Sequence, residues 1–452
     1  MRSTPADAGA STAAAAAATP ADASTAPNDS LNTPQMRRIL TSSFLGSAIE
    51  FYDFMLYATA SAVVFSKVFF ADLDPAMATF ASFGTLAAGY VARPLGGIVF
   101  GHFGDRLGRK GVLVTTMLMM GLATTAIGLL PTYAQVGGIA PLLLVVLRLV
   151  QGFAVGGEWG GAMLIALEHA PGGKRGFAAS FANLGAPAGS LLSASILALF
   201  SLLPDDAFFS WGWRVPFLLS IVLVLIGMFV RLKVVESPLF QKFNAEAEDR
   251  RVPIVEVFTK SWRNLVLGIM VAMTQLTISG IASVWAVSYA VAQGADKTGV
   301  LNSKAFAAIA LFLCTIIAAR LSDRFGRKPV IAFGIIAAIA FAYPLLLLVE
   351  SGTTVGFTVA VMVGQGIQGI ILGPLAAFLA ELFPTSVRFT GSSVAFQGAS
   401  AIGAGFTPII ASALVASAGI GLLGGVWIGV LVLCLVALFI ASEGRKKDLA
   451  SI

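Results

Sequence analysis

Apolar runs about as long as a bilayer is thick dominate this sequence and constrain its fold more than any other feature. Twelve such runs of roughly 20 residues follow one another, and only 12% of the residues are charged. The runs show no alternation of apolar and polar residues, which favours helices over the strands of a membrane β-barrel. The sequence therefore predicts an all-α membrane protein with twelve transmembrane helices. They span about 39–66, 80–103, 112–132, 141–168, 176–203, 213–232, 263–292, 303–321, 329–350, 355–382, 390–416 and 420–441.

Positive charges fall almost entirely on one side of this helix series. With a cytoplasmic N-terminus, 23 of the 29 Lys and Arg lie on the cytoplasmic side and two, Arg93 and Arg148, lie inside the membrane. The four expected outside are Lys67, Arg214, Lys297 and Lys304. The positive-inside rule then predicts that both termini of this multi-pass inner-membrane protein are cytoplasmic. The same asymmetry explains the net charge of +6, so no nucleic-acid partner is expected.

Two motifs of the first half recur in the second half. GDRLGRK (104–110) returns as SDRFGRK (322–328), and EHAPGGKR (168–175) returns as ELFPTSVR (381–388). The copies fall at the same ordinal places, after helices 2 and 8 and after helices 4 and 10. Parallel six-helix repeats are an architecture of secondary transporters. The residues assigned to gating and structure are Gly104, Asp105, Arg106, Gly108, Arg109, Asp323, Arg324, Gly326, Arg327, Glu168, Arg175, Glu381 and Arg388.

These repeats divide the chain into five parts. We expect a disordered, Ala/Ser/Thr/Pro-rich cytoplasmic tail at 1–35, six-helix bundles at 36–232 and 263–441, a charged cytoplasmic linker at 233–262 and a short tail at 442–452. In the loop after helix 2, we expect Asp105 to hold an adjacent Arg or a helix N-terminus.

GHFGDRLGRK and its copy resemble the signature loop of the major facilitator superfamily. IEFYDF in helix 1, RLVQGFAVGGEWGGA in helix 4 and WGWRVPF at the start of helix 6 resemble the metabolite:H⁺ symporter family within it. That family includes shikimate, α-ketoglutarate and proline/betaine carriers, and the first half is most similar to the shikimate carrier. The resemblance implies a central cavity lined by helices 1, 4, 7 and 10, a small organic acid as substrate and H⁺ as coupling ion.

Five charged residues lie deep in the predicted helices. At about 1.5 Å per residue, Glu50, Arg93 and Glu158 fall about 15–16 Å from the cytoplasmic side, and Asp53 and Arg148 fall about 20 Å from it. We therefore expect an Asp53–Arg148 pair in one state and a Glu50–Arg93 contact below it. Interhelical ion pairs with a purely structural role are the alternative.

The three acids exceed the two arginines by one negative charge. One bound proton would remove this imbalance, which is costly at low dielectric. We assign proton coupling to Asp53 and Arg148, with Glu50 and Glu158 as further candidates. On protonation of Asp53, Arg148 would be free to bind the carboxylate of the substrate. The other candidate substrate residues are Arg93, Tyr57, Gln151, Gln275, Gln365 and Gln368.

Other functional classes fit less well. A membrane enzyme would need a nucleophile–base constellation, a metal cluster or a P-loop, and the sequence has none of these motifs. We expect no metal or cofactor, only the coupling proton, and a functional monomer. Within carriers, the alternatives are a zwitterion or osmolyte symporter of the proline/betaine type and, less favoured, a drug or metabolite efflux carrier.

Overall fold

The computed structural model describes residues 34–107, 109–156, 163, 166–167, 170, 174–232, 253–384 and 387–443. For residues 34, 35, 101–107, 109, 110, 113, 230–232 and 253 it describes the backbone alone. Most of the predicted tail 1–35, most of the linker 233–262 and most of the tail 442–452 thus lie outside the described residues.

The described part of the chain is built from helices. In the first half these are α1 (Pro34–Val63), α2 (Phe65–Val68), α3 (Pro75–Leu107), α4 (Arg109–Leu129), α5 (Tyr133–Val136), α6 (Ile139–Val155), α8 (Arg175–Phe200), α9 (Asp205–Ala207), η1 (Phe208–Gly212), α10 (Arg214–Leu218) and α11 (Ser220–Leu232). In the second half they are α13 (Pro253–Lys260), α14 (Trp262–Ile278), η2 (Ser279–Trp285), α15 (Ala286–Ala292), α16 (Lys297–Phe325), α17 (Arg327–Glu350), α18 (Thr354–Leu382), α19 (Arg388–Ala399), η3 (Ser400–Gly405) and α20 (Thr407–Ile440).

Within the described ranges, eight helical segments are long and apolar enough to cross a membrane. One of them, Arg388–Ile440, is two helices, because Ala418 and Gly419 leave helical geometry and Gly419 has φ 75°. Only glycine adopts that backbone at little cost, and the sequence predicted a break at this point. Counted as two helices, this segment raises the number from eight to nine. The shorter apolar helices Val114–Leu129 and Ile139–Val155 and the helix α1 bring it to the predicted twelve.

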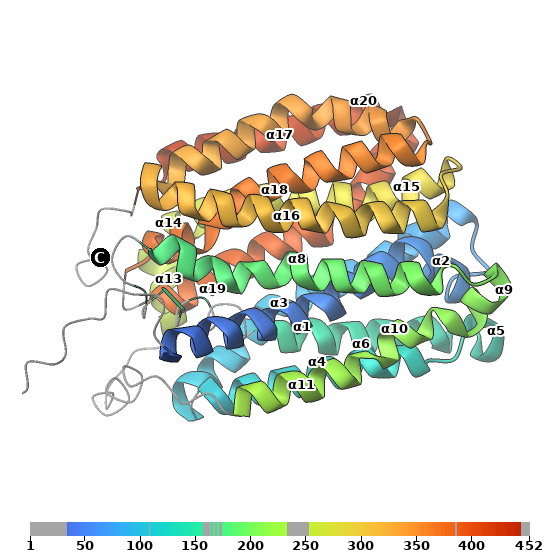
Figure 1. Cartoon of the computed structure of the whole chain (residues 1–452), viewed down its shortest axis with the longest axis horizontal. Coiled ribbons are helices and arrows are strands. Elements are labelled where there is room, and N and C mark those ends of the chain that lie inside the picture. Colours follow the sequence, from blue (N-terminus) through green and yellow to red (C-terminus); the bar gives the residue numbers. More distant parts are fainter. Residues whose placement is uncertain are drawn as a thin grey trace, which may run out of the picture.

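The two halves repeat one packing pattern. In the first half α1 packs on α8, α3 on α6 and α4 on both α6 and α11; in the second half α14 packs on α19, α16 on α18 and α17 on both α18 and α20. Across the boundary, α8 lies along α16 while α3 lies along α19 and η3 (Figure 1). Each half therefore offers equivalent helices to the other.

Close helix contact in the first half depends on glycine. A Cβ on Gly152 of α6 would overlap the carbonyl oxygen of Gly89 of α3, and a Cβ on Gly156 would overlap the carbonyl oxygen of Arg93. Small residues let membrane helices approach in this way because lipid gives no hydrophobic drive for association. This contact fixes the position of Arg93 relative to α6.

We predict that Gly152→Ala lowers the stability of the protein by about 1–3 kcal/mol, because the new methyl group would push backbone against backbone. Thermal unfolding in detergent measures the change. Gly84→Ala on α3 is the matched control, since nothing lies within 4 Å of its added Cβ. Equal melting temperatures for the two variants would contradict the proposed close contact.

Candidate functional site

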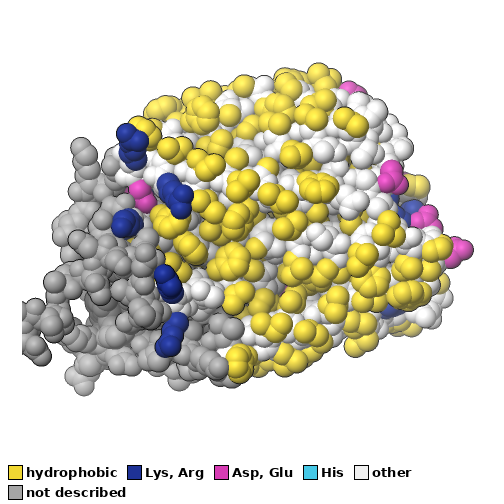
Figure 2. Space-filling view, in the orientation of Figure 1, with side chains coloured by type: hydrophobic (Ala, Val, Ile, Leu, Met, Phe, Trp, Pro, Cys, Tyr) yellow, Lys and Arg dark blue, Asp and Glu magenta, His cyan; other side chains and the backbone are white. Residues whose placement is uncertain are grey.

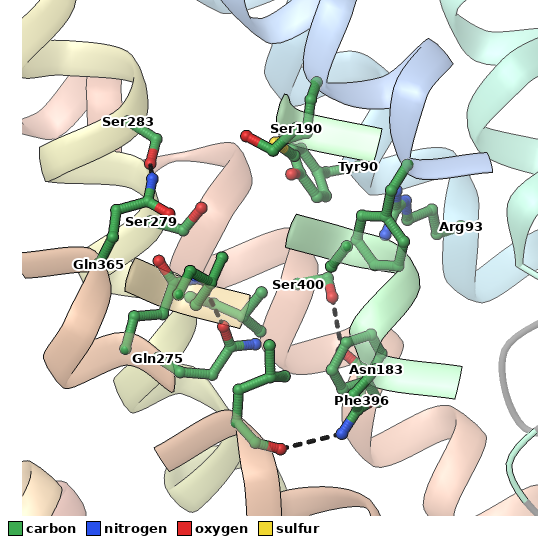
Figure 3. Close-up of a pocket in the computed structure, with 17 residues that line it drawn as sticks. Tyr90, Arg93, Asn183, Ser190, Gln275, Ser279, Ser283, Gln365, Phe396 and Ser400 are labelled. Atoms are coloured by element: carbon green, nitrogen blue, oxygen red, sulfur yellow. Dashed lines mark hydrogen bonds between the residues drawn. The ribbon is translucent and has the colours of Figure 1, made fainter. Parts of the chain in front are cut away.

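A cavity lies between the two halves. Its walls come from α1, α3 and α8 on one side and from α14, η2, α16, α18, α19 and η3 on the other (Figure 3). Ser279 and Ser283 of η2 and Ser400 of η3 reach it from π-helical turns. Such turns carry an extra residue and often occur at functional sites. Here they turn serine hydroxyls of two helices toward one space.

Four amide side chains belong to the polar lining, those of Asn183, Gln275, Gln365 and Gln368. Gln368 Nε2 donates to Gln275 Oε1 at 3.0 Å, Gln365 Nε2 donates to Ser283 Oγ, and Asn183 Nδ2 donates to the Leu372 carbonyl at 2.9 Å. In all three donating side chains the amide oxygen is buried and has no hydrogen-bond partner. Buried acceptors without partners are costly, so these oxygens suit a ligand that carries hydroxyl or N–H donors.

Arg93 is the one charged side chain among the described residues that line the cavity. Its guanidinium carbon lies 3.8 Å from the ring centre of Phe54 and 4.6 Å from that of Tyr90. These ring faces stabilise the cation, and its Nε remains without a hydrogen-bond partner. Glu50 of α1 lies near enough to Arg93 to interact with it electrostatically, and a direct contact between them stays a prediction.

Three residues predicted to bind substrate do not line the cavity. Arg148 is fully buried between the rings of Phe54 and Tyr57, at 3.9 and 4.0 Å from their centres. Tyr57 donates to Thr85 Oγ1 at 2.7 Å, and Gln151 accepts from Arg148 Nη1 at 3.0 Å. In this conformation Phe54 and Tyr57 of α1 enclose Arg148 of α6, so these three residues lie behind the cavity wall, and their assignment to substrate binding stays a prediction.

The expected Asp53–Arg148 ion pair is also not formed in this conformation. Asp53 is buried, its Oδ1 accepts from Ser220 Oγ of α11 at 2.5 Å, and its Oδ2 has no partner. The two residues are linked only indirectly: Gln151 bridges Arg148 to Thr124 (Nε2–Oγ1 2.6 Å), and Thr124 lies beside Asp53. Arg148 satisfies its charge on aromatic faces instead of a carboxylate.

The second-half signature motif joins the two halves at the end of the molecule where α16 ends and α17 begins (Figure 1). Asp323 pairs with Arg327 at 2.6 Å and accepts the backbone N–H groups of Gly176 and Phe177, at 3.0 and 2.9 Å. The motif aspartate thus holds both an arginine and the N-terminus of α8. We expected this of Asp105, and its second-half counterpart does it.

The other described motif residues lie near the same end of the molecule. Arg327 also pairs with Glu381 at 3.2 Å, and Gly326 has φ 108°, a turn that requires glycine. Arg388 Nε donates to the Ala380 carbonyl at 3.0 Å. Arg324 lies over the ring of Phe325 (5.3 Å), and Arg175 opens α8 with an unpaired Nε. Glu158, Glu168 and Gly108 lie outside the described residues, as do the side chains of Gly104, Asp105, Arg106 and Arg109.

The halves also touch at the opposite end, which carries α9. Lys297 of α16 pairs with Asp205 of α9 at 2.6 Å, Thr298 bonds Ser201 at 3.0 Å, and Lys304 donates to Thr59 of α1. Contacts between the halves therefore lie at both ends of the cavity.

Several residues at the boundary between the halves were not among the predicted site residues, among them Tyr90, Asn183 and Ser283, which line the cavity, and Lys304. Asn183 follows no charge pattern, and Ser283 reaches the cavity only through the π-helical turn. Lys304 was assigned to the outside surface, yet its side chain is fully buried. It belongs to α16, which begins six residues earlier than predicted.

Comparison with known proteins identifies the class. The family model described as Major Facilitator Superfamily matches residues 43–400 and 305–451. The D-xylose-proton symporter has the same fold: its crystal structure aligns with a TM-score of 0.72 over 92% of this chain and 99% of that one, at 19% identity. The chain belongs to the major facilitator superfamily, as predicted, and is a membrane transporter and not an enzyme.

Two relatives narrow the class to metabolite carriers. The inner membrane metabolite transport protein YhjE of Escherichia coli (strain K12) is 42% identical over 91% of this chain and 95% of its own length. The shikimate transporter of the same organism is 39% identical over 85% of this chain and 89% of its own length. This chain is thus similar to carriers of small metabolites throughout both halves.

We predict that Asp323→Asn destabilises the contact between the halves by about 3–5 kcal/mol, because it leaves Arg327 and Glu381 as an incomplete buried network. The amide would also present N–H groups to the α8 N-terminus. A lowered melting temperature in detergent is the expected result.

Glu256→Gln is the matched control, because it removes an exposed pair with the same i, i+4 spacing (Lys260–Glu256, 3.5 Å). That change should stay within about 0.5 kcal/mol. An Asp323→Asn protein as stable as the Glu256→Gln protein would show that the network does not hold the halves together.

Proposed function

We propose that this transporter is a proton-coupled symporter that takes up a small hydroxylated carboxylic acid by alternating access. One observation carries the proposal: among the described lining residues, the cavity combines one cation, Arg93, with three unpaired amide oxygens from Asn183, Gln365 and Gln368. A carboxylate would bind the guanidinium, and hydroxyl groups would donate to the amides. The similarity to the shikimate transporter supports this class.

Proton coupling is assigned to Asp53. An ionised carboxylate buried with one hydroxyl donor and no adjacent cation is costly, and a proton at its free Oδ2 removes the charge. Ser220 lies on α11, whereas Asp53 lies on α1. A movement of these two helices relative to each other during transport would therefore change the stability of the ionised Asp53 carboxylate. The D-xylose-proton symporter provides a precedent for proton-driven transport on this fold.

We assign the end of the molecule where α20 ends to the cytoplasmic side. In Figure 2 the Lys and Arg side chains in view gather mainly at that end, and the Asp and Glu side chains mainly at the opposite one. This distribution supports cytoplasmic termini by the positive-inside rule.

A zwitterion symporter of the proline/betaine type is the second candidate. The rings of Phe51, Tyr90 and Phe396 in the lining could accommodate a substituted ammonium group. A betaine, however, has no hydrogen-bond donor for the three unpaired amide oxygens, and the ammonium group of proline has only two N–H donors for them. We therefore favour the hydroxylated acid.

Uptake by proteoliposomes with an imposed pH gradient tests the substrate class. The panel holds shikimate, a 2-oxo acid, a dicarboxylate, an aromatic acid and glycine betaine. We expect the hydroxylated monocarboxylate to show the lowest KM, and Arg93→Gln to raise that KM about 100-fold, because losing one partner of a buried charge pair costs about 2–5 kcal/mol.

Arg263→Gln serves as the control, since Arg263 is exposed at the start of α14. Its kinetics should match the unchanged protein. Preferred uptake of betaine, or unchanged acid uptake by Arg93→Gln, would refute the proposal.

For Asp53→Asn we expect loss of accumulation against a gradient, while exchange of labelled for unlabelled substrate continues, because exchange needs no net proton movement. The pH dependence of uptake should flatten as well. Glu256→Gln, which alters a carboxylate that pairs within α13, should retain accumulation. If Asp53→Asn still accumulates substrate with an unchanged pH profile, Asp53 is not the coupling residue.

A further inference from the structure

Lys304 is a fully buried lysine at the boundary between the two halves. It projects from α16 of the second half, and its Nζ donates to Thr59 Oγ1 on α1 of the first half. Among the described residues no carboxylate lies within ion-pair distance of it. The side chain is therefore enclosed by helices and does not extend to water or lipid headgroups, as a lysine near a helix end normally does.

Such a position is costly for a lysine. An ammonium has three N–H donors, and the structure gives it one hydroxyl acceptor. An unpaired charge at low dielectric destabilises the closed packing around it, and an apolar side chain of similar length would fit at less cost. Residues that break a local packing rule in this way are frequently functional.

The contact lies directly beyond the cavity, toward the α9 end. Leu311 lines the cavity seven residues further along α16, two turns from Lys304 and on the same helix face. Met55 lines it four residues before Thr59 on α1. Lys304 and Thr59 thus lie on two helices that line the cavity. Each is about 6–10 Å from the lining residue of its own helix, in the direction of the α9 end.

The charged groups on neighbouring elements leave Lys304 isolated. On α1, Glu50 interacts with Arg93 and Asp53 bonds Ser220; on α18, Glu381 pairs with Arg327 at the far end. Lys297, on the same face of α16, pairs with Asp205 at the surface. None of the described carboxylates therefore pairs with Lys304.

We propose that Lys304 and Thr59 form an anion-binding station at the α9 end of the cavity, which receives the carboxylate of the substrate before it reaches Arg93. When the halves separate at this end, the Lys304–Thr59 bond breaks and the ammonium faces the entry path. When they close, the carboxylate has passed to Arg93 and Thr59 again accepts from Lys304. The identity of the anion as substrate rests on the proposed function; the opening and the anion attraction do not.

Thiol modification tests opening and anion attraction without any substrate. In purified full-length protein with Cys314→Ala and Cys434→Ala, Thr59→Cys is reacted with anionic sulfonatoethyl or cationic trimethylammonioethyl methanethiosulfonate. Detergent solution leaves both ends accessible, so the membrane orientation is not presupposed. We expect the anionic reagent to react faster, and its rate relative to the cationic one to fall about tenfold with Lys304→Met, since one unit charge acts at short range.

Two further variants separate charge from packing. Lys304→Arg keeps the charge and should keep the anionic preference, whereas Lys297→Met removes a cation seven residues away and should leave most of it. Size-exclusion profiles check that each variant is folded. No reaction with either reagent, or an unchanged rate ratio in Lys304→Met, would overturn the proposal.

Uptake kinetics then test the link to the substrate. With shikimate as probe, Lys304→Gln should raise KM about tenfold while Lys304→Arg restores it. The uncharged methyl ester should compete equally well in both variants. If the unchanged protein does not transport shikimate although the thiol test succeeds, the proposed substrate fails and the anion station stands. Saturable shikimate uptake that Lys304→Gln leaves unaltered would exclude a role in substrate entry.

Discussion

The cost of an unpaired charge in a low-dielectric interior shapes this molecule more than any other interaction. The buried ionic groups are stabilised against this cost in different ways. Arg93 and Arg148 both stack on Phe54 and add Tyr90 or Tyr57. Asp53 accepts one short hydrogen bond from Ser220, and Arg327 binds two carboxylates. The fully satisfied group, Arg327, orders Asp323, which holds the halves together through the N-terminus of α8, whereas the under-satisfied ones lie where a transport cycle needs a change of state.

Helix geometry places these groups. Gly89, Gly152 and Gly156 bring α3 and α6 into backbone contact, and Gly89 also leaves room for the Arg148 side chain. In the second half, the π-helical turns η2 and η3 direct Ser279, Ser283 and Ser400 into the cavity. The first half thus supplies the cation, and the second half supplies most of the neutral hydrogen-bonding groups. This division matches a substrate with one charge and several hydroxyls.

Depth along each helix could be estimated from the sequence, because rise per residue is fixed. This estimate placed Glu50 at the same depth as Arg93, and in the structure the two residues interact electrostatically. The estimate also placed Asp53 at the same depth as Arg148, yet these two residues form no ion pair. Depth carries no information about which side chains lie between two helices, and here the rings of Phe54 and Tyr57 hold Arg148. The assignment of Lys304 to the outside surface failed for a related reason, because α16 begins earlier than its hydropathy indicates.

The sequence by itself determined the class of this protein. Twelve apolar runs, the duplicated loop motifs and the family signature follow from local composition and order, since each membrane helix satisfies its own backbone. Tertiary structure decided which polar residues share a cavity, that Arg93 and not Arg148 lines it, and that Lys304 is buried against Thr59. The physical reason is that contacts between helices depend on rotation and close packing, which glycines, aromatic rings and π-helical turns set together across the whole bundle.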